Sequence, residues 1–150
     1  MTRRQRLRLI AFCVFMFLGI SALQTRALVG AGAERSRVLS VLRAQASGDA
    51  DAVLAKLPEC RRSPTCSRLA RRRTARLKRP GAVQILNYTP SVQVTFTNQS
   101  GHGRVAWRTE DERFPVVQCV FVRREGPLTG GGVEVVSISD PVGLEAPCGR

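Results

Sequence analysis

The first 33 residues divide into a charged start and an apolar run. Residues 2–8 hold four arginines and no acidic residue, and in residues 9–23 nothing is more polar than Ser21. A basic start followed by an apolar run is typical of an export signal, and positive charge stays on the cytoplasmic side of a membrane. The pattern therefore predicts a cytoplasmic N-terminus and places the chain from about Glu34 outside the cytoplasm.

The apolar run can be retained as an anchor or removed as a signal peptide. As a helix it extends about 22 Å, at roughly 1.5 Å per residue, which is shorter than a hydrocarbon core of about 30 Å. Apolar residues resume at 27–33, however, and the side chains of Arg8 and Arg26 are long enough to reach either interface. We expect a tilted, single-pass anchor within residues 1–33. Cleavage after Ala27 or Ala33, which would release a secreted protein, is the alternative.

After Glu34, apolar residues recur at helical spacing, which predicts a helix with one buried side. Its apolar positions include Val38, Val41 and Leu42. Asp49 then stands at the N-cap of a second helix, and Pro58 ends that helix because the residue before proline is pushed out of the α region. A third helix is predicted over residues 67–78, where Pro80-Gly81 stops it.

From residue 83 onward the period changes to alternation, which predicts strands. The predicted strands are residues 83–88, 92–98, 105–109, 116–123 and 133–139. Short turns between them favour antiparallel pairing, and Ser100-Gly101-His102-Gly103 is one of these predicted turns. The strand at 116–123 is apolar on both faces, so we expect it inside the sheet.

Helices followed by strands predict an α+β fold. It would consist of an N-terminal apolar helix and then two to three helices packed on a curved antiparallel sheet of about five strands. An exported body of roughly 115 residues can bury one core but not two. We therefore expect three regions: 1–33 as signal or anchor, 34–141 as one exported domain, and 142–150 as an irregular tail tethered by Cys148.

The cysteines agree with an exported domain. Apart from Cys13 in the apolar run, their number is even, which favours disulfides in an oxidising compartment. Of the three possible pairings we favour the one that joins Cys60 to Cys66 and Cys119 to Cys148. A zinc site is disfavoured because the spacings are not ligand-like and the single histidine, His102, lies between glycines. No metal or cofactor is expected.

The net charge of +13 is concentrated in two segments. Residues 1–33 contribute five basic groups and residues 61–79 nine, with no acid in either, whereas the remaining residues hold ten basic and eleven acidic side chains. The second segment predicts a basic amphipathic helix, which can bind an anionic membrane surface. The candidate contact residues are Arg68, Arg71, Arg72, Arg73, Arg76 and Arg79. A solvated helix, rich in arginine because of a GC-rich genome, is the alternative.

The order of elements resembles a known family. A helix, then a segment beginning Ala46-Ser47-Gly48-Asp49-Ala50-Asp51, then a meander of strands is similar to the nuclear transport factor 2-like family, over about residues 34–141. The resemblance implies a cone-shaped α+β domain with an apolar cavity between helices and sheet. That family includes isomerases, small-ligand binders and catalytically silent accessory domains. Tyr88, at a strand end, is the candidate pocket residue.

The chain offers few groups for catalysis in such a cone. The acids considered as candidates are Glu134 and the turn residues 110–112, and the lone histidine, at a predicted loop tip, disfavours a Ser/His/Asp set. Gly130-Gly131-Gly132 lacks the lysine and the helix of a phosphate-binding loop. The arginine-rich segment has no aromatic residue for base stacking, which disfavours a nucleic-acid partner.

We therefore expect an exported, membrane-tethered, noncatalytic interaction or small-ligand-binding module of the cell envelope. Its expected partner is the membrane through the N-terminal segment, together with an anionic lipid surface or an envelope protein. A small-molecule enzyme, isomerase- or hydrolase-like, that uses the cone-shaped pocket is the alternative.

Overall fold

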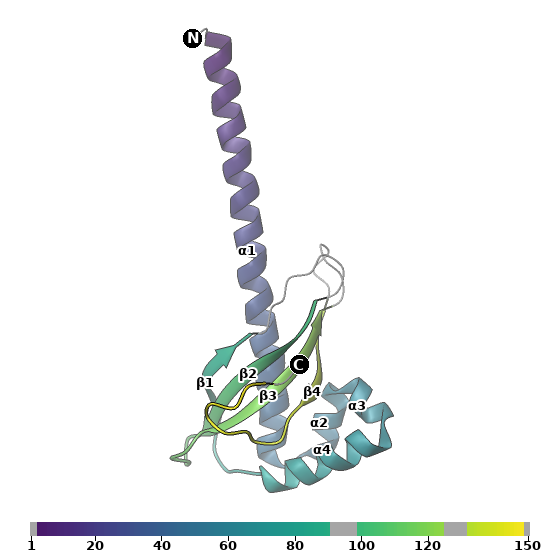
Figure 1. The fold of residues 1–150 in the computed structure, drawn as a ribbon. Helices are drawn as coiled ribbons and strands as arrows, with labels where there is room; N and C mark the ends of the chain where they lie inside the picture. The colour runs from purple at the N-terminus through teal and green to yellow at the C-terminus, as the bar shows by residue number, and fades with distance from the viewer. Residues whose placement is uncertain (1–2, 91–98, 125–131, 149–150) are drawn as a thin grey trace. The chain divides into compact units, whose positions relative to one another are not determined.

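In the computed structural model, the described residues are 3–90, 99–124 and 132–148, with side chains except at residues 3–4, 6–9, 11, 22–31, 99 and 124. Contacts between residues divide the chain into two compact units, Met1–Gly32 and Ala33–Arg150. The helices are α1 (Arg3–Ser47), α2 (Ala50–Lys56), α3 (Pro58–Arg62) and α4 (Pro64–Arg76). The strands are β1 (Val83–Thr89), β2 (Gln99–Thr109), β3 (Val116–Arg124) and β4 (Val133–Ile138) (Figure 1). The α+β class is confirmed.

α1 joins two segments that the sequence predicted separately, the apolar N-terminal helix and the helix after Glu34. In the first unit the large apolar side chains from Ile10 to Ile20 that are described are each 50–80% exposed. Because successive residues point about 100° apart on a helix, such a run leaves no polar side. Among the residues whose side chains are described, no helix is long and apolar enough to cross a membrane.

Short-range capping determines where the next helices begin. α2 starts after Asp49, whose carboxylate accepts a hydrogen bond from the amide of Ala52 at 2.8 Å, as predicted for an N-cap. Pro58 does more than end α2, because it also opens α3, a short helix that the pattern did not indicate. α4 begins earlier than predicted, since Pro64 occupies its first turn and the Ser63 hydroxyl caps it.

The four described strands form one antiparallel sheet in the order β1-β2-β3-β4. β3 lies inside the sheet, as expected from its apolar residues. The strand predicted at 92–98 falls outside the described residues. The turn predicted at Ser100-Gly101-His102-Gly103 is wrong, because these residues belong to β2 and pair with β3.

Gly103 explains why the glycines misled the prediction. A Cβ atom at this position would lie 3.2 Å from the carbonyl oxygen of Thr89 and 3.3 Å from the hydroxyl of Tyr88. Glycine is therefore favoured by a close approach of β1 to β2, and such an approach is a second reason for finding glycine within a strand.

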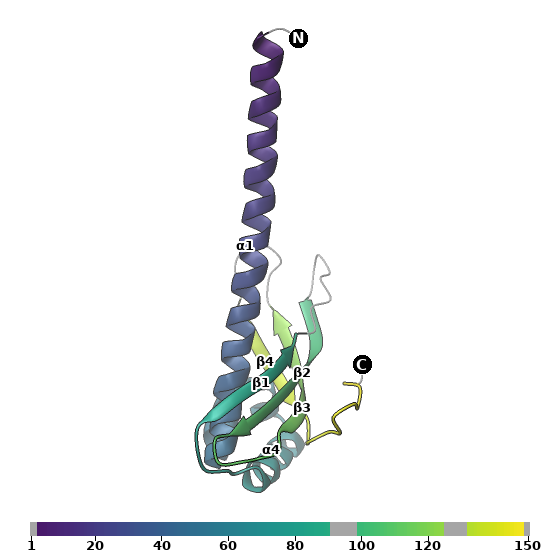
Figure 2. The ribbon, with the colours of Figure 1, turned by 90° about the vertical axis from the view of Figure 1, so that its left-hand side faces the viewer.

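One face of the sheet packs against the second-unit part of α1 (Figure 2). The strand register places Val105 and Trp107 of β2 and Val120 of β3 on this face, and all three are fully buried. They meet the apolar stripe of α1, which includes Val38 and Leu42. The core therefore lies between the end of one long helix and the middle strands.

The core also contains a closed polar network centred on Gln118. Its side-chain oxygen accepts hydrogen bonds from the Trp107 indole at 2.8 Å and from the Gln45 amide at 3.0 Å. Its own amide donates to the carbonyl oxygen of Ser139 at 2.8 Å. Buried polar groups are tolerated only when they are paired in this way, so the network ties α1, β2, β3 and the segment after β4 to one arrangement.

We predict that Gln118→Leu destabilises the protein by about 3 kcal/mol. The substitution leaves the Trp107 indole N–H, the Gln45 amide and the Ser139 carbonyl without their partner, and each buried unpaired group costs roughly 1–3 kcal/mol. Thermal unfolding followed by circular dichroism should show a melting temperature lower by about 12 °C, at roughly 4 °C per kcal/mol for a unit of this size.

The matched control is Gln84→Leu, since Gln84 is exposed on β1 and its amide reaches only Glu110. We expect that variant to stay within about 0.5 kcal/mol of the parent protein. Equal melting temperatures for the Gln118 and Gln84 variants would contradict a supporting role for the network.

Candidate functional site

Tyr88, the predicted pocket residue, is half-buried and packs against the core at the end of β1. Its hydroxyl donates a hydrogen bond to the carboxylate of Glu34, which is only 3% exposed. Gly103 on β2 leaves room for the Tyr88 ring. The pair therefore connects the start of the second-unit part of α1 to the end of β1.

Glu34 was missed as a partner of Tyr88, although its position carried a signal. It lies four residues before Val38, so helical spacing places it on the buried side of α1 together with Leu42 and Gln45. A carboxylate on an apolar stripe indicates a buried polar contact. The residue that completes that contact, Tyr88, lies far along the chain and could not be inferred from the helix alone.

A groove of about 720 Å³ lies elsewhere in the second unit, and Tyr88 does not line it. Its walls come from the C-terminal end of α1 and from the loop between α4 and β1. The lining residues include Arg43, Ser47, Lys78, Arg79 and Pro80. Arg79 is paired with Glu112 at 2.9 Å, and the stem of Lys78 lies over Gly48, whose φ of +79° only glycine adopts readily.

Four of the six arginines predicted to contact a membrane surface form ion pairs within the domain. Arg71 contacts Asp51 at 2.7 Å, and Arg79 contacts Glu112. Arg73 and Arg76 both contact Asp140, at 3.0 and 3.1 Å. These contacts attach α4 to α2 and to the segment after β4, and they attach the loop after α4 to the turn after β2.

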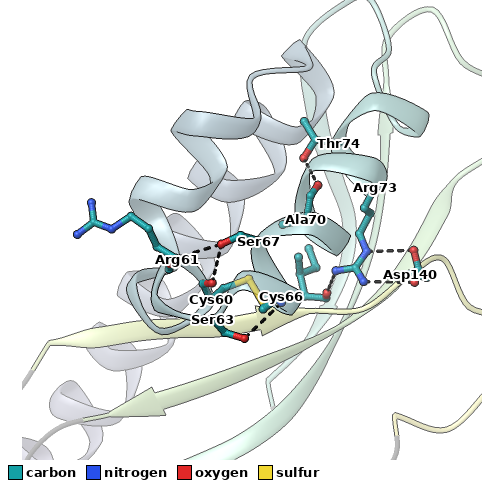
Figure 3. Close-up of a disulfide and its surroundings, with 10 residues drawn as sticks. Cys60, Arg61, Ser63, Cys66, Ser67, Ala70, Arg73, Thr74 and Asp140 are labelled. Carbon is teal, nitrogen blue, oxygen red and sulfur yellow. Dashed lines mark hydrogen bonds and ion pairs between the residues drawn. A yellow bond between two sulfur atoms is a disulfide. The ribbon is translucent and has the colours of Figure 1, made fainter.

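Arg73 makes the most enclosed of these contacts, with its side chain only 14% exposed (Figure 3). Its guanidinium donates to both carboxylate oxygens of Asp140 and to the carbonyl oxygen of Ile138. The hydrogen bond from Arg73 holds the pKa of the Asp140 carboxyl below its usual value. Arg73 is therefore a structural contact between α4 and the sheet.

The remaining arginines of α3 and α4 are exposed. Arg61, Arg62, Arg68 and Arg72 make no ion pair with any residue that the structure describes. In Figure 3 the side chain of Arg61 points away from the disulfide and the Arg73–Asp140 pair. Arg68 and Arg72 are thus the two members of the predicted set that keep a free guanidinium.

Glu134, one of the acids considered for catalysis, has a structural partner. Arg123 contacts Glu134 at 3.1 Å and also Glu59 of α3, and these hydrogen bonds, chiefly the one to Glu59, raise the pKa of the Arg123 guanidinium. Within the part of the chain that is described, no group of acids, cysteines or histidine is arranged to hold a metal ion. His102 stacks on Phe121 of β3 with ring centres 4.8 Å apart.

Two disulfides brace the domain, in the pairing that the sequence favoured. Cys60–Cys66 joins α3 to α4 (Figure 3), and Cys119–Cys148 joins β3 to the C-terminal segment. That segment is further held by backbone hydrogen bonds from Ser139 to Cys119 and from Val142 to Val117. Cys13 is free and exposed. The tail after residue 141 is thus anchored to the middle of the sheet.

The chain matches no family model, no curated protein and no solved structure.

We predict that the two disulfides contribute unequally to stability. In the chain-entropy account the longer loop restricts the unfolded state more, so removing Cys119–Cys148 with serines should cost about 3.5 kcal/mol and removing Cys60–Cys66 about 2.5 kcal/mol. Chemical denaturation of the two paired-serine variants measures both values. Thiol titration of the protein purified without reductant should find a single free thiol, that of Cys13, and additional free thiols would refute the pairing.

Proposed function

We propose that this chain is an exported, membrane-tethered, noncatalytic interaction or small-ligand-binding module of the cell envelope. The observation that carries the proposal is the first unit, where large apolar side chains between Ile10 and Ile20 are exposed on every side of α1. A helix that is apolar all round is matched to lipid or to a protein core. The four arginines before it favour insertion with a cytoplasmic N-terminus.

The second unit supports an exported location and a noncatalytic role. Two disulfides suit an oxidising compartment. Trp107, Leu42 and Val120 fill the space between α1 and the sheet, where a cone-shaped enzyme would keep its pocket. The order of helices followed by an antiparallel meander agrees with a nuclear transport factor 2-like domain, and we propose that relationship for residues 34–141.

We predict that replacing Arg3, Arg4, Arg6 and Arg8 with glutamate impairs export or inverts the chain, because positive charge sets orientation. A reporter enzyme that works only outside the cytoplasm, fused after Arg150, should be active in the parent protein and lose activity in the variant. The matched control replaces Arg37, Arg43, Arg72 and Arg113, which lie beyond the apolar run, and should leave the activity unchanged.

The same fusion tests the tether. The membrane-bound protein should have the mass of a chain that retains residues 1–33. A mature chain beginning at Leu28 or Glu34 would refute the tether while leaving export intact. A full-length parent fusion that shows no reporter activity would refute export.

The buried Glu34–Tyr88 pair favours one alternative, a small-molecule enzyme of the isomerase or hydrolase kind, since a carboxylate bonded to a phenol is a common acid–base arrangement. Under the proposal above, we predict that Tyr88→Phe only lowers the melting temperature, because it removes a donor from a buried carboxylate oxygen. Compounds that raise the melting temperature in a ligand screen should then act equally on both proteins. A compound that stabilises the parent protein but not Tyr88→Phe would favour the enzyme.

A further inference from the structure

The arginines of residues 61–79 fall into two sets that differ in their contacts. The arginines of one set form ion pairs with carboxylates of the same domain. The other set, which we call the open arginines, consists of Arg61, Arg62, Arg68 and Arg72, and it has no acidic partner among the described residues. The open arginines therefore keep their full positive charge at the surface.

The fold joins the two helices that carry the open arginines. The Cys60–Cys66 disulfide joins α3 to α4, and the Ser67 hydroxyl donates to the carbonyl oxygen of Cys60 at 2.9 Å. Arg68 and Arg72 lie one turn apart on α4, where two like charges repel each other. An anion that contacts both guanidiniums would relieve that repulsion.

The side-chain chemistry favours phosphate groups at an apolar boundary. A guanidinium presents a planar set of donors that matches phosphate oxygens in pairs. Leu69 lies between Arg68 and Arg72 in the sequence and is 48% exposed, so the same surface offers an apolar contact. A lipid headgroup region supplies both, because its phosphates border the acyl chains.

We propose that the open arginines form a docking surface for anionic phospholipid headgroups. The inference rests on the proposed function, since a tether raises the local concentration of lipid and lets a weak contact suffice. It also revises the predicted contact set: Arg71, Arg73, Arg76 and Arg79 are paired with acidic residues, whereas Arg68 and Arg72, together with Arg61 and Arg62, face the lipid.

The test uses the full chain in nanodiscs of phosphatidylcholine, mixed with vesicles that contain phosphatidylglycerol or phosphatidylcholine alone. Flotation should recover the protein with the phosphatidylglycerol vesicles only, and less of it as salt shortens the Debye length to about 8 Å. Each arginine near a charged surface contributes on the order of fivefold in partitioning, so Arg61→Gln, Arg68→Gln and Arg72→Gln combined should weaken binding roughly 100-fold.

The matched control is the combined substitution Arg37→Gln, Arg43→Gln and Arg113→Gln, which removes the same charge from other exposed positions. It should weaken binding by less than about threefold, because screening limits charge effects to within a Debye length. Equal losses of vesicle binding in the two triple variants would overturn the proposed docking surface. The absence of vesicle binding at low salt would overturn it as well. All six side chains are exposed, so both variants should melt like the parent protein.

One further measurement distinguishes a lipid partner from an acidic protein partner. Leu69→Ser should weaken vesicle binding, and poly-glutamate should compete poorly. If poly-glutamate binds as tightly as the vesicles and Leu69→Ser changes neither, the partner is a carboxylate surface and the lipid assignment is overturned. Flotation does not depend on where the chain resides in the cell. A lack of vesicle binding therefore does not affect the export proposal, and a negative result in the reporter test of export does not affect the flotation result.

Discussion

The arrangement of the second unit depends on the hydrogen bonds of one side chain, that of Gln118. A glutamine buried in a core is destabilising unless its oxygen and its amide both find partners. Gln118 meets that requirement through Trp107, Gln45 and the Ser139 carbonyl, which belong to β2, α1 and the segment after β4. Apolar contacts alone would tolerate small shifts between these elements, whereas the three bonds require one register.

The ion pairs at the surface differ in how strongly they connect the elements of the fold. Arg73 and Arg123 each contact groups from two other elements, so they connect helices to the sheet where apolar contacts are few. Exposed pairs such as Arg71–Asp51 contribute little to stability because water screens them. Positive charge in this domain is therefore of three kinds: structural at Arg73 and Arg123, weakly paired at the rim, and open on α3 and α4.

Local rules predicted the parts of the fold that depend on neighbours in sequence. The Asp49 cap, the ends of α2 and the inner place of β3 all follow from a few adjacent residues. The glycines of β2 did not, because glycine suits both a turn and a close approach, and only the position of Tyr88 decides between them. Gln118 was counted with an apolar strand since its partners lie on three other segments.

The candidate site, like the fold, could be predicted only in part from the sequence. The pattern located the arginine-rich helix and Tyr88, but it could not separate the paired arginines from the open ones. That distinction depends on Asp51 and Asp140, which approach α4, and on Glu112, which approaches the loop after it, and these approaches are a property of the folded chain. Glu34 carried a signal in its helical spacing, yet its partner was not evident until β1 was placed.

The Cys119–Cys148 disulfide affects the order in which the chain can mature. Cys148 follows every described strand of the sheet, so this bond cannot form until the whole sheet has left the ribosome or a translocation channel. Cys60 and Cys66 lie six positions apart and can be oxidised as soon as that short stretch emerges. Covalent locking of the sheet is therefore a late event, and a product that stops before residue 148 would keep an unpaired Cys119 thiol in the middle of the sheet.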